Sequence, residues 1–145
     1  MCSIYDTHMK GFTDAATGFA ADAHGNGVAY TRLMLRGTPR VLRVPFTLKR
    51  YPALLDREVG YAALAAVAGA LGRRGIERPR FLVGDTQLVR DLAEHRDVPA
   101  ALMLAYVRLR CALNQFKEYD IAVSVAGEND LTARAQSEVA MHVAA

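Results

Sequence analysis

The first third of the chain contains short stretches in which apolar residues alternate with polar or small ones. Three such stretches, 9–16, 28–35 and 41–48, predict β-strands. The segments 25–27 and 36–39 between them contain glycine, which tolerates the positive φ angles of tight turns. Short turns join neighbouring strands in opposite directions, so the pattern predicts a three-stranded antiparallel meander.

Beyond this meander the apolar spacing becomes helical. Residues 54–74 carry apolar positions three and four residues apart and end on two arginines and a glycine, which predicts a long helix. The remaining pattern predicts strands at 80–83 and 120–125 and helices at 85–95, 98–116 and 131–143. The order βββαβααβα requires a mixed sheet with helices packed on it. A right-handed crossover through 54–74 makes the third and fourth strands parallel.

Length and composition predict one soluble domain over 1–145, with 1–8 as a loose N-terminal segment. Cys2 and Cys111 are far apart and have no metal-ligand spacing, which favours a reducing, cytoplasmic environment. The N-terminal residues lack the pattern of a signal peptide, and no apolar run reaches the roughly 18 residues of a membrane span.

The net charge of +3 is compatible with a phosphate-bearing partner, because basic residues gather on the second and third predicted strands and their turns. The predicted nucleic-acid-binding residues are Arg40, Arg43, Lys49 and Arg50. Alternation on a half-exposed sheet would produce the same basic residues without a ligand. The helix at 98–116 is apolar beyond one face, which fits either core packing or a partner interface such as a homodimer.

Three segments match motifs of one known family. Residues 12–18 (FTDAATG) place an aspartate followed by small residues in the first strand region. Residues 81–89 (FLVGDTQLV) place a second aspartate directly before Thr-Gln-Leu-Val at the start of a helix. Residues 119–125 (YDIAVSV) and Asn129 precede the last helix. These segments resemble the ribonuclease H family, and the resemblance extends over 9–143.

The resemblance implies a ribonuclease H-like α/β fold with a mixed five-stranded sheet, three antiparallel strands followed by parallel ones. It also implies hydrolysis by two Mg²⁺ or Mn²⁺ ions roughly 4 Å apart, which activate water and neutralise the phosphate. Such hard cations need oxygen ligands, so the family brings carboxylates together from distant segments. By position, the implied metal ligands are Asp14 and Asp85, and the implied catalytic set is Asp14, Asp85 and Glu58.

Two positions depart from the family pattern. The helix motif Ala-Glu-Tyr-x-Ala-Leu falls on 59–64 (VGYAAL), which puts Gly60 in the place of the glutamate. Glu58 lies two residues earlier, about 200° around an ideal helix, and substitutes only if the helix register shifts. The motif Asn-x-x-Ala-Asp falls on 129–133, which puts Ala133 at the last metal position.

Three functional hypotheses follow. The first is a nucleic-acid-binding domain with a partly lost metal site, holding at most one Mg²⁺ or Mn²⁺, in which hydrolysis is weak or absent. The second is an active Mg²⁺- or Mn²⁺-dependent ribonuclease H that cleaves RNA in RNA–DNA hybrids, with Glu58 recruited to the site. The third is a non-catalytic scaffold that uses the helix at 98–116 for self-association or another protein. Asp85 can also serve simply as a helix cap, and Glu58 as a first-turn charge.

Overall fold

The computed structural model of the chain describes residues 11–48, 56–94, 98–124 and 129–144. The predicted loose segment 1–8 lies outside this part. The elements, in chain order, are β1 (Thr13–Ala21), β2 (Asn26–Leu35), β3 (Thr38–Thr47), α1 (Asp56–Arg73), β4 (Pro79–Val83), α2 (Thr86–Glu94), the 3₁₀ turn η2 (Ala100–Leu102), α3 (Met103–Leu113), β5 (Asp120–Val123) and α4 (Asn129–Ala144). Apart from the added 3₁₀ turn, this is the predicted order.

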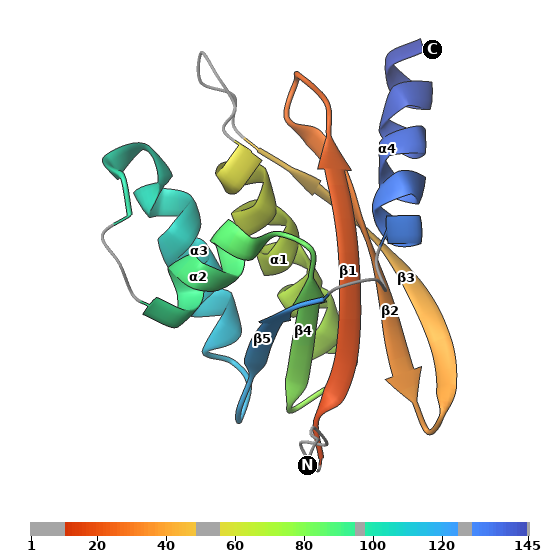
Figure 1. Cartoon of the computed structure of the whole chain (residues 1–145), viewed down its shortest axis with the longest axis vertical. Helices are drawn as coiled ribbons and strands as arrows, with labels where there is room; N and C mark the ends of the chain where they lie inside the picture. The colour runs from red at the N-terminus through yellow and green to blue at the C-terminus, as the bar shows by residue number, and fades with distance from the viewer. Residues whose placement is uncertain (1–10, 49–55, 95–97, 125–128, 145) are drawn as a thin grey trace.

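The strands form one five-stranded sheet in the order β3-β2-β1-β4-β5. β1, β2 and β3 are antiparallel neighbours, and β4 pairs in parallel with both β1 and β5. The predicted mixed sheet is therefore confirmed. Figure 1 shows the long β1 in the middle of the sheet, with β4 and β5 on one side of it and β2 and β3 on the other.

The first strand lies later in the chain than predicted, at Thr13–Ala21 instead of 9–16. Ala15 and Thr17 are buried, and Phe19 packs on the same core, so the alternation of this strand continues well past residue 16. Alanine, threonine and glycine dominate the strand and give only a weak hydrophobic signal, which explains the misplaced boundary.

The predicted helix at 98–116 is in fact the turn η2 followed by the shorter helix α3. Pro99 precedes the turn in an extended conformation, with ψ 145°. The helix ends at Leu113, and Leu109 and Leu113 are its buried residues.

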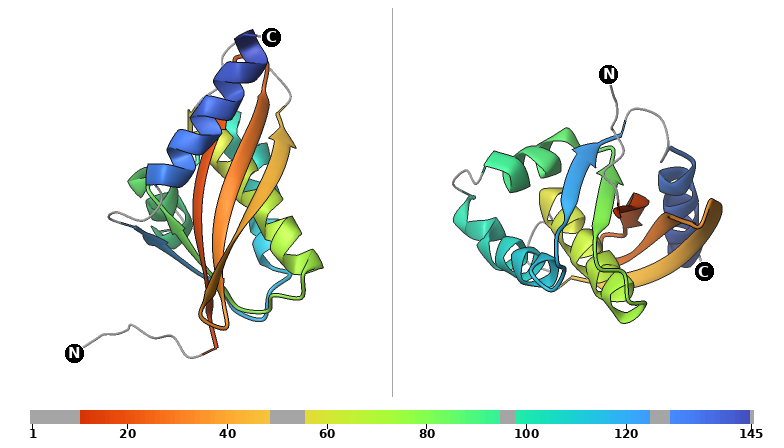
Figure 2. Two further views of the ribbon diagram at one scale, coloured as in Figure 1. Left: turned by 90° about the vertical axis from the view of Figure 1, so that its right-hand side faces the viewer. Right: turned by 90° about the horizontal axis from the view of Figure 1, so that it is seen from below.

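Helices cover the two faces of the sheet unequally. On one face α1, α2 and α3 enclose the large core, in which Tyr61, Leu64 and Phe81 are fully buried. On the other face α4 packs over β1 and β2, and a small second cluster forms there from Val28, Tyr30, Leu131 and Ala135. Figure 2 shows α4 alone on its side of the sheet. None of the helices in the described part is long and apolar enough to cross a membrane.

Candidate functional site

The register of β1 against β4 decides which residues can meet at the carboxyl end of β4. Asp14 pairs with Arg80 at the start of β4, and Thr17 pairs with Val83 at its end. Asp85 follows two residues after Val83, so the β1 residue at its level is Phe19. Asp14 and Asp85 are five positions apart along this register, roughly 16 Å at the rise of a β-strand. The structure does not bring the two predicted metal ligands together.

Asp14 lies instead in a row of charges across three strands. Arg80 pairs in register with Asp14 on β1 and with Asp120 on β5. Its guanidinium lies 3.9 Å from the Asp14 carboxylate and 3.3 Å from the Asp120 carboxylate. Both carboxylates are thus balanced by one arginine, an arrangement that orders the sheet and needs no metal ion.

Asp85 caps the helix that follows it. Its Oδ1 accepts a hydrogen bond of 3.1 Å from the backbone N–H of Leu88, in the first turn of α2. This is the helix-capping role open to an aspartate at that position, and it satisfies one of the N–H groups that a helix start leaves without partners.

Apolar groups fill the space beside Gly60. A Cβ placed on Gly60 would lie 3.4 Å from the ring of Phe19 and 3.4 Å from a methyl group of Leu88. Gly60 therefore faces β1 and α2, and helix geometry puts Glu58 about 200° away from that direction. Glu58 is partly exposed, and Ala133 lies exposed on α4.

Comparisons with known proteins identify the fold but do not assign a role to Asp14, Glu58 or Asp85. No protein-family model matches the sequence, and no curated protein is similar to it. Solved structures do match. Ribonuclease H1 of the archaeon Halobacterium salinarum shares 17% identity at a TM-score of 0.70, over 90% of this chain and 98% of that one. The chain has the ribonuclease H fold.

Two further structures with this fold are similar over almost their whole length. The N-terminal ribonuclease H domain of Rv2228c from Mycobacterium tuberculosis has 13% identity and a TM-score of 0.69, over 91% of this chain and 98% of that one. LC11-RNase H1, isolated from compost by a metagenomic approach, has 10% identity and a TM-score of 0.61, over 92% and 99%. It was solved in complex with an RNA/DNA hybrid.

The described residues of this ribonuclease H fold do not fit a pair of divalent cations. Within the described part, no three side chains of the histidine, cysteine, aspartate and glutamate types gather closely enough to hold a metal ion. Mg²⁺ and Mn²⁺ require several oxygen ligands. Around Phe19 and Gly60 the structure offers aromatic and aliphatic groups instead, with Asp85 engaged as a helix cap.

The predicted nucleic-acid-binding residues are placed unequally. Lys49 and Arg50 lie outside the described residues, and Arg40 is exposed on β3. Arg43 is turned toward α4, where its Nε donates to both carboxylate oxygens of Glu138 at 2.9 and 3.0 Å. This contact raises the pKa of Arg43 above its ordinary value. Arg43 therefore holds α4 against the sheet.

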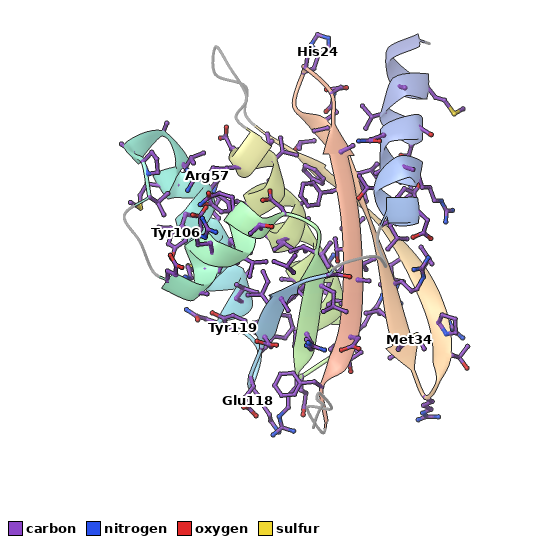
Figure 3. All side chains as sticks on the ribbon, viewed as in Figure 1. His24, Met34, Arg57, Tyr106, Glu118 and Tyr119 are labelled. Atoms are coloured by element: carbon purple, nitrogen blue, oxygen red, sulfur yellow. The ribbon has the colours of Figure 1, made fainter. Side chains whose placement is uncertain are left out.

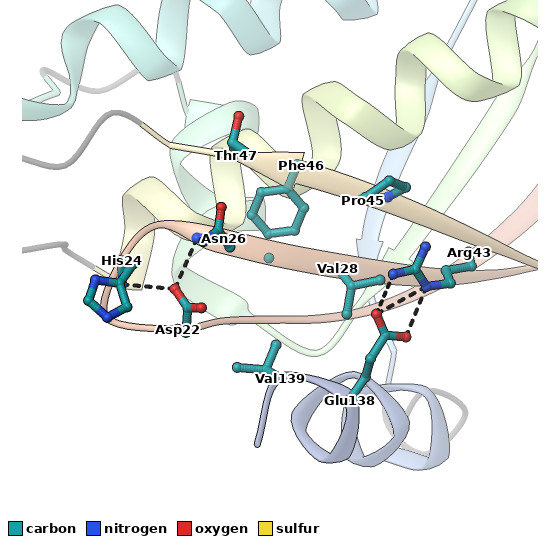
Figure 4. A pocket seen from close by; sticks show the side chains of 11 residues that line it. Asp22, His24, Asn26, Val28, Arg43, Pro45, Phe46, Thr47, Glu138 and Val139 are labelled. Atoms are coloured by element: carbon teal, nitrogen blue, oxygen red, sulfur yellow. Dashed lines mark hydrogen bonds and ion pairs between the residues drawn. The ribbon is translucent and has the colours of Figure 1, made fainter. Parts of the chain in front are cut away.

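Figure 4 shows Arg43 and Glu138 at the mouth of a cavity of about 550 Å³ between the β1–β2 turn, β3 and α4. At its other end Asp22 accepts hydrogen bonds from the backbone N–H groups of His24 and Asn26, at 2.8 and 3.0 Å. These bonds, that of Asn26 above all, lower the pKa of Asp22. The charged groups around this cavity thus hold a turn and a helix in place.

A buried charge network was missed in the sequence. Asp91 of α2 is only 3% exposed. It accepts hydrogen bonds from Arg57 at 2.7 and 3.1 Å, from Gln87 at 2.8 Å, and from the hydroxyl of Tyr61. Figure 3 labels Arg57, which belongs to α1 on the face of the sheet opposite α4. The signal was present, since Arg57 and Tyr61 are four residues apart on one helix and Gln87 and Asp91 four apart on the next.

The network changes the acidity of its members. Burial, and then the hydrogen bond to Asp91, raises the pKa of Tyr61 to about 12. Burial alone would raise the pKa of Asp91, but the donors Tyr61, Arg57 and Gln87 outweigh it and lower that pKa. Both groups are thus held in their usual ionisation states at neutral pH, as a structural network requires.

Proposed function

We propose that this ribonuclease H-fold domain binds nucleic acid, of the RNA–DNA hybrid or RNA class, and hydrolyses it weakly or not at all. One observation supports the claim that hydrolysis is weak or absent. The residue level with Asp85 on β1 is Phe19, whose ring packs on Gly60. The claim that the domain binds nucleic acid is supported by the structure of LC11-RNase H1, which has the same fold, in complex with an RNA/DNA hybrid.

The chemical reason lies in the number of carboxylates. Holding two ions across an attacked phosphate takes three or four converging carboxylates. Here Asp85 caps a helix, Asp14 pairs with Arg80, and Glu58 points away from Phe19 by helix geometry. An active Mg²⁺- or Mn²⁺-dependent nuclease would need these three side chains together, and the β1–β4 register separates the two aspartates.

The test is a cleavage assay on an end-labelled RNA–DNA hybrid, with Mg²⁺ and separately with Mn²⁺. The expected result is hybrid binding by fluorescence anisotropy, with no more cleavage than by an Asp14→Asn/Asp85→Asn double variant prepared in the same way. A Glu58→Gln variant is assayed beside them. Cleavage by the wild type that disappears in these variants would show an active metal site and contradict the proposal.

A second candidate function, as a protein-interaction scaffold, is favoured by the surface of α3. Met103, Leu104 and Val107 are 44%, 62% and 46% exposed. Val107 follows Leu104 by three residues and Met103 by four, so the three lie on one side of the helix. Exposed apolar residues gathered in this way favour a protein contact, here a homodimer through α3. Sedimentation of the wild type against a Leu104→Glu/Val107→Glu variant tests it. A dimer that the variant dissociates supports the scaffold, whereas a monomeric wild type removes the homodimer.

A further inference from the structure

A second cavity, of about 360 Å³, lies between the edge strand β3 and the last turns of α1. Its apolar lining includes Leu42, Val44 and Ala70, and its basic lining is Arg43, Arg73 and Arg74. We call it the β3–α1 groove. Both views of Figure 2 show the end of α1 beside β3, on the face of the sheet opposite α4.

The groove is basic, and none of the described residues in its lining is acidic. Arg43 is neutralised by Glu138, but Arg73 and Arg74 are exposed at the end of α1. Arg40 lies two residues before Leu42, hence on the same face of β3 and about 7 Å further along the strand. Within the described part of the chain, Arg40, Arg73 and Arg74 have no ion-pair partner. Their charge is available to a ligand.

Basic side chains at the carboxyl end of a helix commonly stabilise the partial negative charge there. The geometry of Arg73 and Arg74 indicates that this is not their only role. The nearest atom to a Cβ placed on Gly69 is Nη1 of Arg73, at 3.4 Å, so this guanidinium folds back along the side of α1. The carbonyl of Leu71 already accepts the backbone N–H groups of Arg74 and Ile76, and that of Gly72 accepts the N–H of Gly75. Backbone turns thus satisfy these terminal carbonyls.

Two prolines decide what the open edge of β3 can accept. Within sheets, proline is confined to edge positions whose nitrogen faces away from the neighbouring strand. Pro39 and Pro45 therefore mark the outward-facing positions of β3, and by alternation the N–H groups of Val41 and Arg43 point outward too. An edge with proline at both ends cannot pair well with another strand, so the groove beside it stays open to a different kind of ligand.

We propose that the β3–α1 groove binds the phosphodiester backbone of nucleic acid. The inference rests on the proposed function and locates nucleic-acid contact away from Phe19 and Asp85, since Gly60 and Arg73 are about 20 Å apart along α1. None of the described residues that line the groove is aromatic, so they offer no ring on which a base could stack. Binding there is therefore independent of sequence and steeply dependent on salt.

The experiment follows the affinity for a short fluorescent RNA–DNA hybrid over a series of salt concentrations. Removing two phosphate contacts in an Arg73→Ala/Arg74→Ala variant should lower the slope of log affinity against log salt by roughly 2, and the affinity itself roughly tenfold. The matched control is Arg90→Ala/Arg108→Ala, which removes the same charge from exposed positions on α2 and α3. It should leave the slope near that of the wild type.

A single Arg40→Ala variant provides a second test in case the double variant does not fold. Arg40 is exposed on β3, so its replacement does not affect the end of α1. It should lower the slope by about 1. Equal slopes of log affinity against log salt for the groove variants and the control would show that the groove does not bind phosphates. That result would not contradict nucleic-acid binding elsewhere on the domain. No binding of the hybrid by the wild type at low salt would overturn the proposed function as well.

Discussion

Gly60 shows at the scale of one residue how packing limits which side chain a helix position can accept. Glycine within a helix costs about 1 kcal/mol relative to alanine, so a helical glycine needs a reason. At Gly60 the neighbours Phe19 and Leu88 stand at ordinary contact distance from an added Cβ, leaving space for a methyl group and none for a glutamate in that direction.

Gly60→Ala is therefore expected to raise the free energy of unfolding by up to about 1 kcal/mol, through helix propensity and added contact. Urea denaturation followed by circular dichroism measures it. Gly72→Ala, on the same helix, is the contrast: its Cβ would lie 2.0 Å from Oε1 of Gln115, which must move. A loss of stability in Gly60→Ala would show that the side chains of Phe19 and Leu88 cannot shift to make room for the added methyl group.

Asp91 is the other residue whose environment determines its behaviour. Its carboxylate is buried, and three side chains donate hydrogen bonds to it. Because these donors lower its pKa below the ordinary 3.8, the folded state favours the charged form. The resulting stabilisation is present above pH 3.8 and is lost as the pH falls through the lower folded-state pKa.

Asp91→Asn should thus destabilise the protein by about 3 kcal/mol at neutral pH, because it leaves Arg57 without its partner. The difference from the wild type should shrink as the pH is lowered below 3.8. Unfolding by urea at neutral and acid pH measures both. Asp130→Asn, which removes an exposed ion pair to Arg32, should cost less than about 1 kcal/mol. Equal costs for the two variants would contradict the buried network.

At the scale of elements, α4 is held on the sheet by a close contact and by charges. Gly18 of β1 lies directly under the start of α4, where a Cβ would come within 2.3 Å of the backbone nitrogen of Thr132. Further along, Arg43 binds Glu138, and the guanidinium of Arg134 lies 4.4 Å from the ring centre of Tyr30. Arg43 of β3 and Arg134 of α4 thus help to hold this helix on the sheet.

Gly18→Ala should lower the free energy of unfolding by about 2–3 kcal/mol, because the backbones of β1 and α4 must move apart to make room for the methyl group. Thermal unfolding followed by circular dichroism measures it. Gly84→Ala, where none of the described atoms lies within 4 Å of the added Cβ, is the matched control and should change stability little. Similar melting temperatures for the two variants would mean that α4 does not pack this closely on β1.

At the scale of the whole molecule, the two sides of the sheet differ in stability. The core under α1 and α3 contains large side chains such as Tyr61, Phe81 and Leu109, whereas the cluster under α4 is small. Regions with less buried apolar surface open at lower free energy. The side with α4 is therefore the weaker one.

Amide hydrogen exchange is expected to show that α4 loses protection before α1, by local opening. An Arg43→Ala variant should speed exchange in α4 and leave α1 unchanged, because its ion pair with Glu138 is confined to that side. Mass spectrometry of exchanged peptides measures both. Equal protection in α1 and α4 would mean that the sheet opens only as a unit.

The sequence alone determined the order of elements and the class of sheet. Glycine turns, period-2 strands and helical spacing are local properties, so a local pattern suffices to predict them. The resemblance over residues 12–18 and 81–89 allowed the fold to be predicted, and the departures of Gly60 and Ala133 from the family pattern were visible without coordinates.

Only the tertiary structure decided which side chains meet. The β1–β4 register put Phe19, and not Asp14, level with Asp85. Pairing between distant strands leaves no local trace in a run of alanine and threonine, and a shift along the strand changes every neighbour. For the same reason the docking of Arg43 on α4 and the burial of Asp91 between two helices were decided by packing.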